Sequence, residues 1–250
     1  MADEIVLDCR DIHVHFGAVR AVNGFSFGFR RGRIHSVIGP NGAGKTTLMN
    51  ALSGRVGMAG GQVLLHGRDI GRLRADQRTL AGLGRSFQVT QLFPGFSVRD
   101  NLRLAGLAGR REGGVFWSRV GRRRAALARA DEVLEQIGLR AQAHSLADEL
   151  SHGDQRALEL GLALVSDPPV LLLDEPLAGI GHHNLNDAMA LLTRVVVGRT
   201  VLLIEHNMDV VMGVSDEIVV MTQGRMLASG TPADIKANPA VRAAYLGDEA

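Results

Sequence analysis

The residues Gly39–Thr47 combine glycines with a lysine and a hydroxyl in the pattern Gly-x-x-x-x-Gly-Lys-Thr. Glycines let backbone N–H groups turn toward an anion without obstruction by a Cβ. In such a loop the lysine reaches the β- and γ-phosphates of a nucleoside triphosphate, and the next hydroxyl binds Mg²⁺. We therefore predict a phosphate-binding loop with Lys45 on the phosphates and Thr46 on the metal. Its predicted members are Gly39, Pro40, Asn41, Gly42, Ala43, Gly44, Lys45, Thr46 and Thr47.

The segments on either side of this loop distinguish it from a glycine-rich turn with an exposed lysine. Residues 33–38 form a short apolar run with β-branched members, which predicts a buried strand. Residues 47–52 place apolar side chains at helical spacing. The order strand, glycine loop, helix is the one that phosphate binding requires, because the helix N-terminus then points at the phosphates.

Carboxylates and an imidazole follow two further predicted strands. Residues 170–173 are a continuous apolar run, typical of a strand buried on both faces, and Asp174 and Glu175 come directly after it. Ligands of open parallel sheets bind at this end of the strands. We predict that Asp174 completes the Mg²⁺ shell and that Glu175 polarises a water for attack on the γ-phosphate. His206, after the predicted strand 201–204, is a candidate γ-phosphate sensor.

Composition and charge narrow the class of protein. The 250 residues are 46% hydrophobic and 22% charged, which suits one large domain or one domain with an inserted lobe. A formal net charge of +2 gives no argument for a nucleic acid partner. The one cysteine excludes an internal disulfide and fits a reducing cytosol. We expect no signal peptide and no bilayer span, because no long apolar segment occurs.

The predicted elements give an α/β fold. Residues 5–10, 12–16 and 19–29 are short predicted strands, and residues 60–67 form another that we expect in the same antiparallel sheet. From residue 170 onward strands and helices alternate, which predicts a mostly parallel, doubly wound sheet.

The segment between these parts has a helical pattern of apolar residues. Residues 98–107 and 122–137 have apolar side chains at helical spacing, and a stretch rich in Arg and Gly separates them. We therefore expect one domain over residues 1–250. Its predicted division is an α/β core and β subdomain over 1–90 and 166–250, and a helical subdomain over about 91–165.

Further motifs make the chain resemble the ATP-binding subunit of an ABC (ATP-binding cassette) transporter over nearly its whole length. Phe16 matches the aromatic residue that stacks on adenine in that family, and Gln88 matches the glutamine that links the metal and γ-phosphate to the helical lobe. Leu150–Arg156 lies where the family has its Leu-Ser-Gly-Gly-Gln signature. The Walker B aspartate, the catalytic glutamate and the switch histidine are matched by Asp174, Glu175 and His206.

This resemblance implies a fold and a mechanism. The fold would be a P-loop NTPase core of RecA-like, ABC type, with an antiparallel β subdomain and an inserted α-helical subdomain, and ATP and Mg²⁺ would be the cofactors. Ser151 begins a predicted helix, so its hydroxyl and nearby amides can donate to an anion. In the family that anion is the γ-phosphate held by the opposite subunit. The signature residues acting in trans would be Ser151, His152, Gly153 and Asp154.

Two cassettes, identical or paralogous, would therefore close head to tail on ATP and part after hydrolysis. Motion of the helical lobe would pass to separate transmembrane permease subunits. Three features depart from the family pattern: His152 replaces a glycine, Asp154 replaces a glutamine, and residues 178–181 lack the aspartate common in the D-loop. A carboxylate near a triphosphate is unfavourable unless it points away, so we expect a less efficient site in trans.

The stretches 84–88, 92–102 and 230–247 resemble the branched-chain amino acid importer group, which includes urea and short-amide systems. The resemblance implies import through permeases, an extracytoplasmic solute-binding protein as partner, no nucleic acid, and a position at the cytoplasmic face of the membrane. Two alternatives stay open: a cassette of a lipid or lipopolysaccharide exporter, and a slowly hydrolysing, nucleotide-gated switch. A soluble ABC protein of DNA repair or translation would need a coiled-coil insertion or a second cassette, which the sequence lacks.

Overall fold

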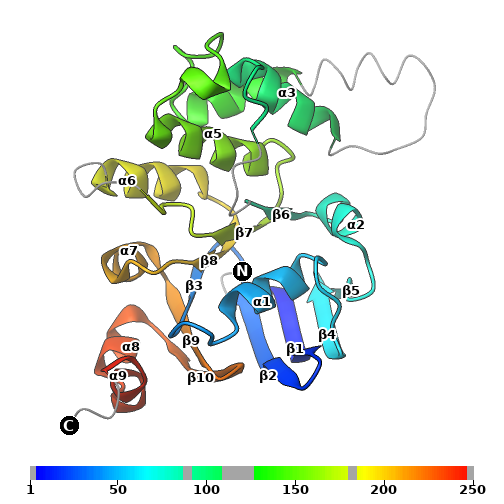
Figure 1. The fold of residues 1–250 in the computed structure, drawn as a ribbon, viewed down its shortest axis with the longest axis vertical. Coiled ribbons are helices and arrows are strands. Elements are labelled where there is room, and N and C mark those ends of the chain that lie inside the picture. Colours follow the sequence, from blue (N-terminus) through cyan, green and yellow to red (C-terminus); the bar gives the residue numbers. More distant parts are fainter. Residues whose placement is uncertain (1–3, 87–91, 109–126, 180–184, 247–250) are drawn as a thin grey trace.

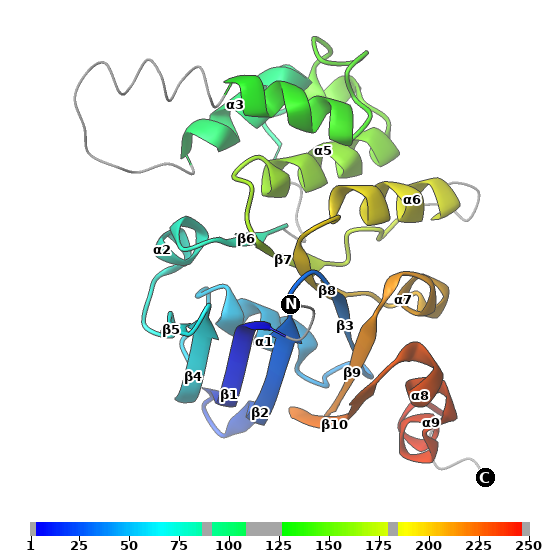
Figure 2. The ribbon, with the colours of Figure 1, turned by 180° about the vertical axis from the view of Figure 1, so that it is seen from behind.

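The computed structural model of this chain describes residues 4–86, 92–108, 127–179 and 185–246. Within these ranges two β-sheets form the centre, and helices gather around them (Figure 1). Helix α3 (Val98–Ala108), a helix over residues 127–136 and helix α5 (His152–Leu164) lie together at one end of the molecule. Helices α8 and α9 lie at the other end, as the reverse view also shows (Figure 2).

The smaller sheet is antiparallel and holds the strands predicted before and after the phosphate loop. Its order is β2-β1-β4-β5, so the expectation that residues 60–67 join this sheet is confirmed. Residues 5–16 form one continuous strand where two were predicted, with a register shift between Cys9 and Ile12. The strands are β1 (Ile5–Phe16), β2 (Val19–Arg30), β4 (Gly60–Leu65) and β5 (Arg68–Asp69).

The larger sheet has the order β10-β9-β3-β8-β7-β6, and its neighbours are parallel except for the antiparallel pair β9–β10. The predicted mostly parallel sheet is therefore confirmed. Every residue of β7 and β8 is buried, as expected for parallel strands covered on both faces. The strands are β3 (Ile34–Ile38), β6 (Leu83–Arg85), β7 (Val170–Asp174), β8 (Thr200–Ile204), β9 (Glu217–Thr222) and β10 (Arg225–Gly230).

The helices predicted over 47–52 and 98–107 are present with similar bounds, whereas α2 (Ala75–Leu80) and α7 (Met208–Val214) were not predicted. The predicted helix over 122–137 is described from residue 127 onward, and the Arg- and Gly-rich stretch before it lies outside the described residues. The helices are α1 (Lys45–Leu52), α2 (Ala75–Leu80), α3 (Val98–Ala108), the helix over 127–136, the short 3₁₀ helix η1 (Ala147–Glu149), α5 (His152–Leu164), α6 (Leu185–Val195), α7 (Met208–Val214), α8 (Pro232–Ala237) and α9 (Pro239–Leu246).

Strand β7 separates the two main hydrophobic cores. Leu171 and Leu173 pack into a core with α3, α5 and α6, whereas Val170 and Leu172 pack into a core with α1 and the smaller sheet. Successive side chains of a strand point to opposite faces, so this alternation anchors β7 from both sides. By the same period, Asp174 follows Leu172 on the α1 side of the sheet.

Candidate functional site

Two glycines fix the path of the phosphate loop. Gly39 has φ +153° and Gly44 has φ +99°. A Cβ on Gly39 would lie 2.1 Å from the carbonyl oxygen of Met221, and one on Gly44 would lie 2.3 Å from that of Ala21. The loop therefore passes directly against β9 and β2, at a distance that only glycine permits.

The first turn of α1 is open to an anion. Its N-cap is Gly44, which offers no side-chain acceptor, and the turn contains no acidic residue. The first N–H groups of a helix have no partner inside the helix, and the helix dipole makes this end positive. Thr46 is exposed here, and Thr47 is half-buried. This local structure suits a phosphate group.

Lys45 crosses the loop that precedes it. Its side chain is buried, and Nζ donates to the carbonyl oxygens of Gly39 at 2.7 Å and Pro40 at 3.1 Å. Burial lowers the pKa of the Lys45 ammonium, and the carboxylates of Glu175 and Asp174 raise it in opposition. The cation thus stands near both predicted carboxylates, although the three residues come from distant parts of the chain.

Asp174 is held through one of its two carboxylate oxygens. Arg85 Nη2 donates to Oδ2 at 3.2 Å, and both side chains are buried. Oδ1 is buried, and no described residue forms a hydrogen bond with it. Burial raises the pKa of Asp174, while the Arg85 guanidinium acts in the opposite direction.

An unpartnered buried carboxylate oxygen is unfavourable, and a hard cation or its water shell would satisfy it. Asp174 therefore fits Mg²⁺, together with the exposed Thr46 hydroxyl. Gln88, the other predicted metal residue, lies outside the described residues.

Glu175 and His206 form a contact at the ends of β7 and β8. His206 Nε2 lies 3.0 Å from Glu175 Oε1. The Glu175 N–H donates to the carbonyl oxygen of Ile204 at 2.9 Å, and Glu175 adopts φ +51°. This left-handed backbone is strained for a residue with a Cβ, and such strain often occurs at functional positions. The geometry holds a carboxylate and an imidazole together beside Lys45 and Asp174.

Sequence reasoning missed two buried charged residues at this site. Glu205 is 5% exposed, and its Oε1 accepts the Leu177 N–H at 2.9 Å, so the end of β8 is tied to the segment after Glu175. Burial raises the pKa of Glu205. Arg85 is the second, through its bond to Asp174. The sequence offered one indication of these two residues: each charged residue stands at or beside the end of a strand, and both strands belong to the same sheet.

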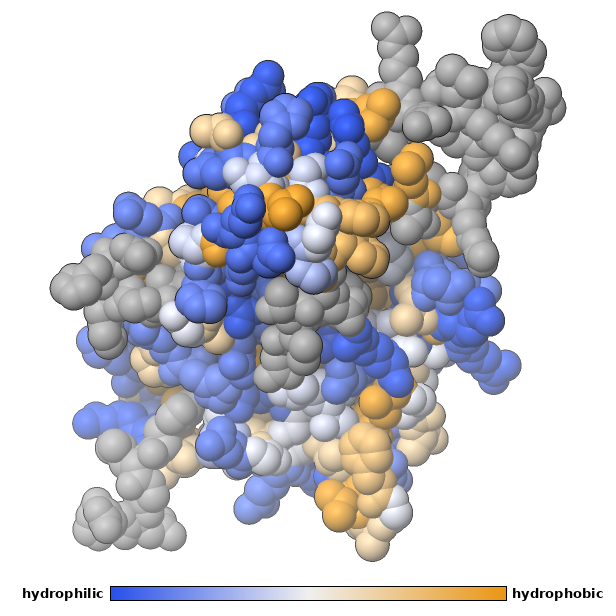
Figure 3. Space-filling view, turned by 45° about the horizontal axis from the view of Figure 1, so that its top comes forward, coloured by the Kyte–Doolittle hydropathy of each residue, from blue (hydrophilic) through white to orange (hydrophobic). Residues whose placement is uncertain are grey.

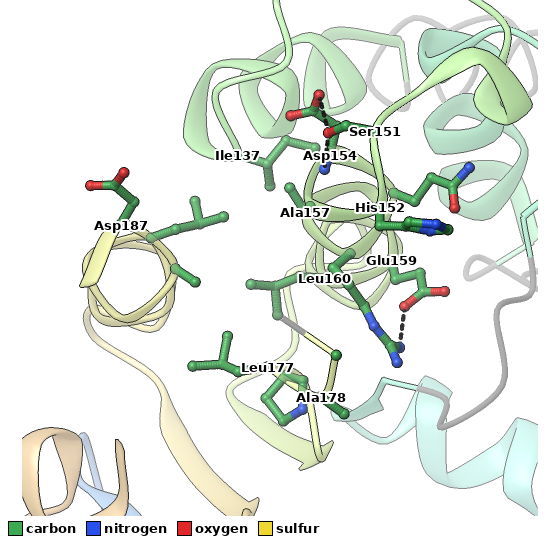
Figure 4. Close-up of a pocket in the computed structure, with 17 residues that line it drawn as sticks. Ile137, Ser151, His152, Asp154, Ala157, Glu159, Leu160, Leu177, Ala178 and Asp187 are labelled. Carbon is green, nitrogen blue, oxygen red and sulfur yellow. Dashed lines mark hydrogen bonds and ion pairs between the residues drawn. The ribbon is translucent and has the colours of Figure 1, made fainter. Parts of the chain in front are cut away.

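The signature residues lie in a different place. Ser151 is the N-cap of α5; its Oγ accepts the Asp154 N–H at 3.2 Å and donates to Asp154 Oδ2 at 2.8 Å. Ser151 to Asp154 line a cavity of about 770 Å³, with residues 176–179 and α6 on the other sides (Figure 4). Across the described ranges, no hydrogen bond or ion pair joins residues 151–154 to the phosphate loop. One chain therefore does not bring its signature to its own loop.

Phe16 lies at the end of the β1–β2 hairpin. It pairs with Val19 across the turn, and its side chain is 52% exposed. The same hairpin contacts the phosphate loop through Ala21. The hairpin that contacts the phosphate loop therefore also carries an exposed aromatic residue. Of the D-loop stretch 178–181, Ala178 and Gly179 are described, and both line the cavity next to the signature.

Comparison with known proteins identifies the family. A family model described as "ABC transporter" matches residues 22–178, which is more than half of the chain. The chain belongs to the ABC transporter family. A second model, described as "Branched-chain amino acid ATP-binding cassette transporter", matches residues 225–250 of this cassette.

Relatives and solved structures match the cassette over nearly its full length. It is 40% identical to the high-affinity branched-chain amino acid transport ATP-binding protein LivG of Salmonella typhimurium, with 97% of this chain and 98% of LivG covered. It is 38% identical to BraF of Pseudomonas aeruginosa, a protein of the same description, with the same coverage. The ADP conformation of MJ1267, an ATP-binding cassette of an ABC transporter, superposes with TM-score 0.84 at 27% identity, covering 98% of this chain and all of MJ1267.

These matches confirm the predicted family, the fold class and the ATPase activity. They also confirm the predicted transport function in its general form, that of an ATP-binding subunit. In the ranges that the structure describes, no helix combines the length and apolar character needed to cross a bilayer.

Replacing Gly44 by alanine should disable the phosphate loop. The new Cβ would meet the Ala21 carbonyl, and the left-handed backbone costs about 1–2 kcal/mol, so the loop must move. We expect ATP affinity to fall at least about tenfold in an equilibrium titration with a fluorescent ATP analogue. Gly57→Ala is the matched control, because a Cβ there meets nothing within 4 Å. Equal affinities for the two folded variants would contradict the assigned role of the loop.

Proposed function

We propose that this chain is the ATP-hydrolysing subunit of an importer for branched-chain amino acids. Support comes from its near full-length similarity to LivG and BraF, whose names state that transport, and from the match of residues 225–250 to a branched-chain amino acid transporter model. The same similarity favours import over the exporter alternative. Urea and short amides remain related solutes that the uptake experiment below distinguishes.

In this proposal the phosphate loop and Lys45 hold the β- and γ-phosphates. Lys45 Nζ now donates to two loop carbonyls, and phosphate oxygens are stronger acceptors because they are charged. Thr46, Asp174 and Gln88 would hold Mg²⁺, which supplies charge neutralisation between the β- and γ-phosphates when bound. The ring of Phe16 would stack on adenine.

Glu175 and His206 would perform the hydrolytic step. Glu175 would accept a proton from the attacking water, which would lie in line with the γ-phosphate. His206, now 3.0 Å from Glu175, would orient that carboxylate and sense the phosphate. The strained backbone of Glu175 and its bond to Ile204 keep the side chain at the strand end where Lys45 also lies.

A second cassette, identical or paralogous, would complete the site with its signature residues. In support of this, no described hydrogen bond or ion pair joins residues 151–154 to the phosphate loop of their own chain. The Ser151 hydroxyl proton is engaged by Asp154, so Ser151 must leave that bond before it can donate to an anion. The bond between Ser151 and Asp154 also favours the nucleotide-gated switch as the second candidate function, because breaking it would slow the binding of the signature residues to the nucleotide.

Partners in the membrane would dock on the helical part of the cassette. We propose the division into a core over 1–90 and 166–250 and a helical subdomain over about 91–165. Phe93 and Phe96 precede α3 with 54% and 47% of their surface exposed, and their rings stack at 5.6 Å. Buried Asn101 holds this loop by donating to the carbonyl oxygens of both phenylalanines.

Apolar residues gather at several places on the face shown in Figure 3. Exposed apolar surface of this kind suits a protein partner. We assign the pair Phe93 and Phe96 to contact with the permease subunits, which would hold the cassette at the cytoplasmic face of the membrane. An extracytoplasmic solute-binding protein would complete the importer.

Glu175→Gln should separate ATP binding from hydrolysis. A general base contributes about 10²–10⁴-fold, so phosphate release should fall at least about 100-fold while ATP affinity is retained. Glu135→Gln is the control, since that carboxylate is 59% exposed and pairs only with exposed Arg140 among the described contacts. Hydrolysis that is unchanged in Glu175→Gln would remove Glu175 from its role.

Uptake by the assembled transporter tests the solute class. The cassette would be reconstituted in liposomes with the permease subunits and binding protein encoded beside its gene. We expect ATP-dependent uptake of labelled leucine, and we expect this uptake to be lost with Glu175→Gln. A cassette with both Phe93→Ser and Phe96→Ser should still bind ATP but should no longer co-purify with the permeases. Uptake of urea without leucine would reassign the solute, and ATP-driven lipid export would overturn the import proposal.

A further inference from the structure

Arg85 connects the two halves of the nucleotide site. It ends strand β6, and its side chain is 7% exposed. Nη1 donates to Ser53 Oγ and, at 3.3 Å, to the carbonyl oxygen of Met49, both in the last turn and C-cap of α1. Nη2 donates to Asp174 Oδ2 at 3.2 Å. One guanidinium thus joins the far end of the phosphate-loop helix to the carboxylate at the end of β7.

The pairing leaves one atom of each group without a partner. Asp174 Oδ1 and Arg85 Nε are both buried, and neither has a hydrogen-bond partner among the residues that the structure describes. A two-armed arginine–carboxylate pair would occupy both oxygens of Asp174. Here the contact to Arg85 uses Oδ2 only, so the second oxygen is available to a ligand.

A second buried arginine, Arg78, also binds the end of α1. Arg78 is 2% exposed and donates to the carbonyl oxygens of Ala51 and Leu52, which also lie in the last turn of α1. Its other bonds go to the carbonyl oxygens of Leu73 and Gly71, and none of its described bonds reaches Asp174. The feature that separates the two buried arginines is therefore the contact with the Asp174 carboxylate.

We propose that Arg85 is a positioning residue for the metal site. It fixes Asp174 through Oδ2, keeps Oδ1 free for Mg²⁺ and its waters, and ties that carboxylate to the helix whose N-terminus faces the phosphates. The inference rests on the proposed role of Asp174 in the Mg²⁺ shell. Without Arg85 the buried carboxylate loses its counter-charge and its fixed orientation, which a metal ligand needs.

The test is the dependence of ATP affinity on Mg²⁺ in the full chain. ATP affinity is measured by titration with a fluorescent ATP analogue in saturating Mg²⁺ and in EDTA, and the ratio of the two reports coupling between metal and nucleotide. We expect Arg85→Gln to lower this ratio about tenfold or more, as loss of a residue that orients a metal ligand does, while affinity in EDTA is retained. Arg85→Lys, which keeps a cation at this position, should give an intermediate ratio.

Two further variants separate the possible failures. Asp174→Asn should lower the ratio at least as much as Arg85→Gln; an unchanged ratio would overturn the role of Asp174 and this inference together. If Asp174→Asn lowers the ratio and Arg85→Gln does not, Arg85 only supports the fold and the proposed function stands. Arg78→Gln should lower the melting temperature but keep the ratio; an equal loss in Arg78→Gln would mean that loosening α1 explains the effect, which also overturns the inference.

Discussion

The parallel register of three neighbouring strands is the constraint on which the site depends. Ile204 of β8 pairs with Val37 of β3 on one side and with Asp174 of β7 on the other. The phosphate loop, Glu175 and His206 therefore leave the sheet at one level. A slip of one residue would turn every side chain of a strand to the opposite face. In β7 such a slip would move Asp174 from the α1 side of the sheet into the core formed with α3, α5 and α6.

This register concentrates buried charge where the strands end. Lys45, Arg85 and Asp174 are all largely buried, and charges in such a place are costly unless they are paired. Lys45 bonds to loop carbonyls, and Arg85 bonds to Asp174, of which one oxygen has no partner in the described part of the chain. The protein thus keeps a partly compensated set of charges, and a metal–triphosphate complex has the charges and acceptors that would complete it.

The sequence was most informative where the residues that carry the chemistry are neighbours in the chain. The phosphate loop, its strand and its helix are contiguous, and the apolar run before Asp174 predicts its burial, so these elements followed from pattern alone. The contacts Arg85–Asp174 and Glu205–Leu177 join residues 89 and 28 positions apart, and no local pattern specifies them. The continuation of β1 through Asp11 was also missed, because in the sequence a polar residue between two apolar runs resembles a strand end. The structure instead has a bulge there, where Asp11 adopts φ +51°. The subdomain boundaries, and Gln88 as a metal residue, stay predictions.

In the proposed function, one chain supplies two complementary parts of a nucleotide site, and a second cassette would join them. Sedimentation velocity of the Glu175→Gln protein, alone and mixed with any cassette paralogue encoded beside it, tests this directly. The account predicts a shift from monomer to dimer when Mg²⁺ and ATP are added, and no shift when Lys45→Ala is introduced into every cassette present. Absence of dimer at saturating ATP, or pairing that persists without Lys45, would contradict it.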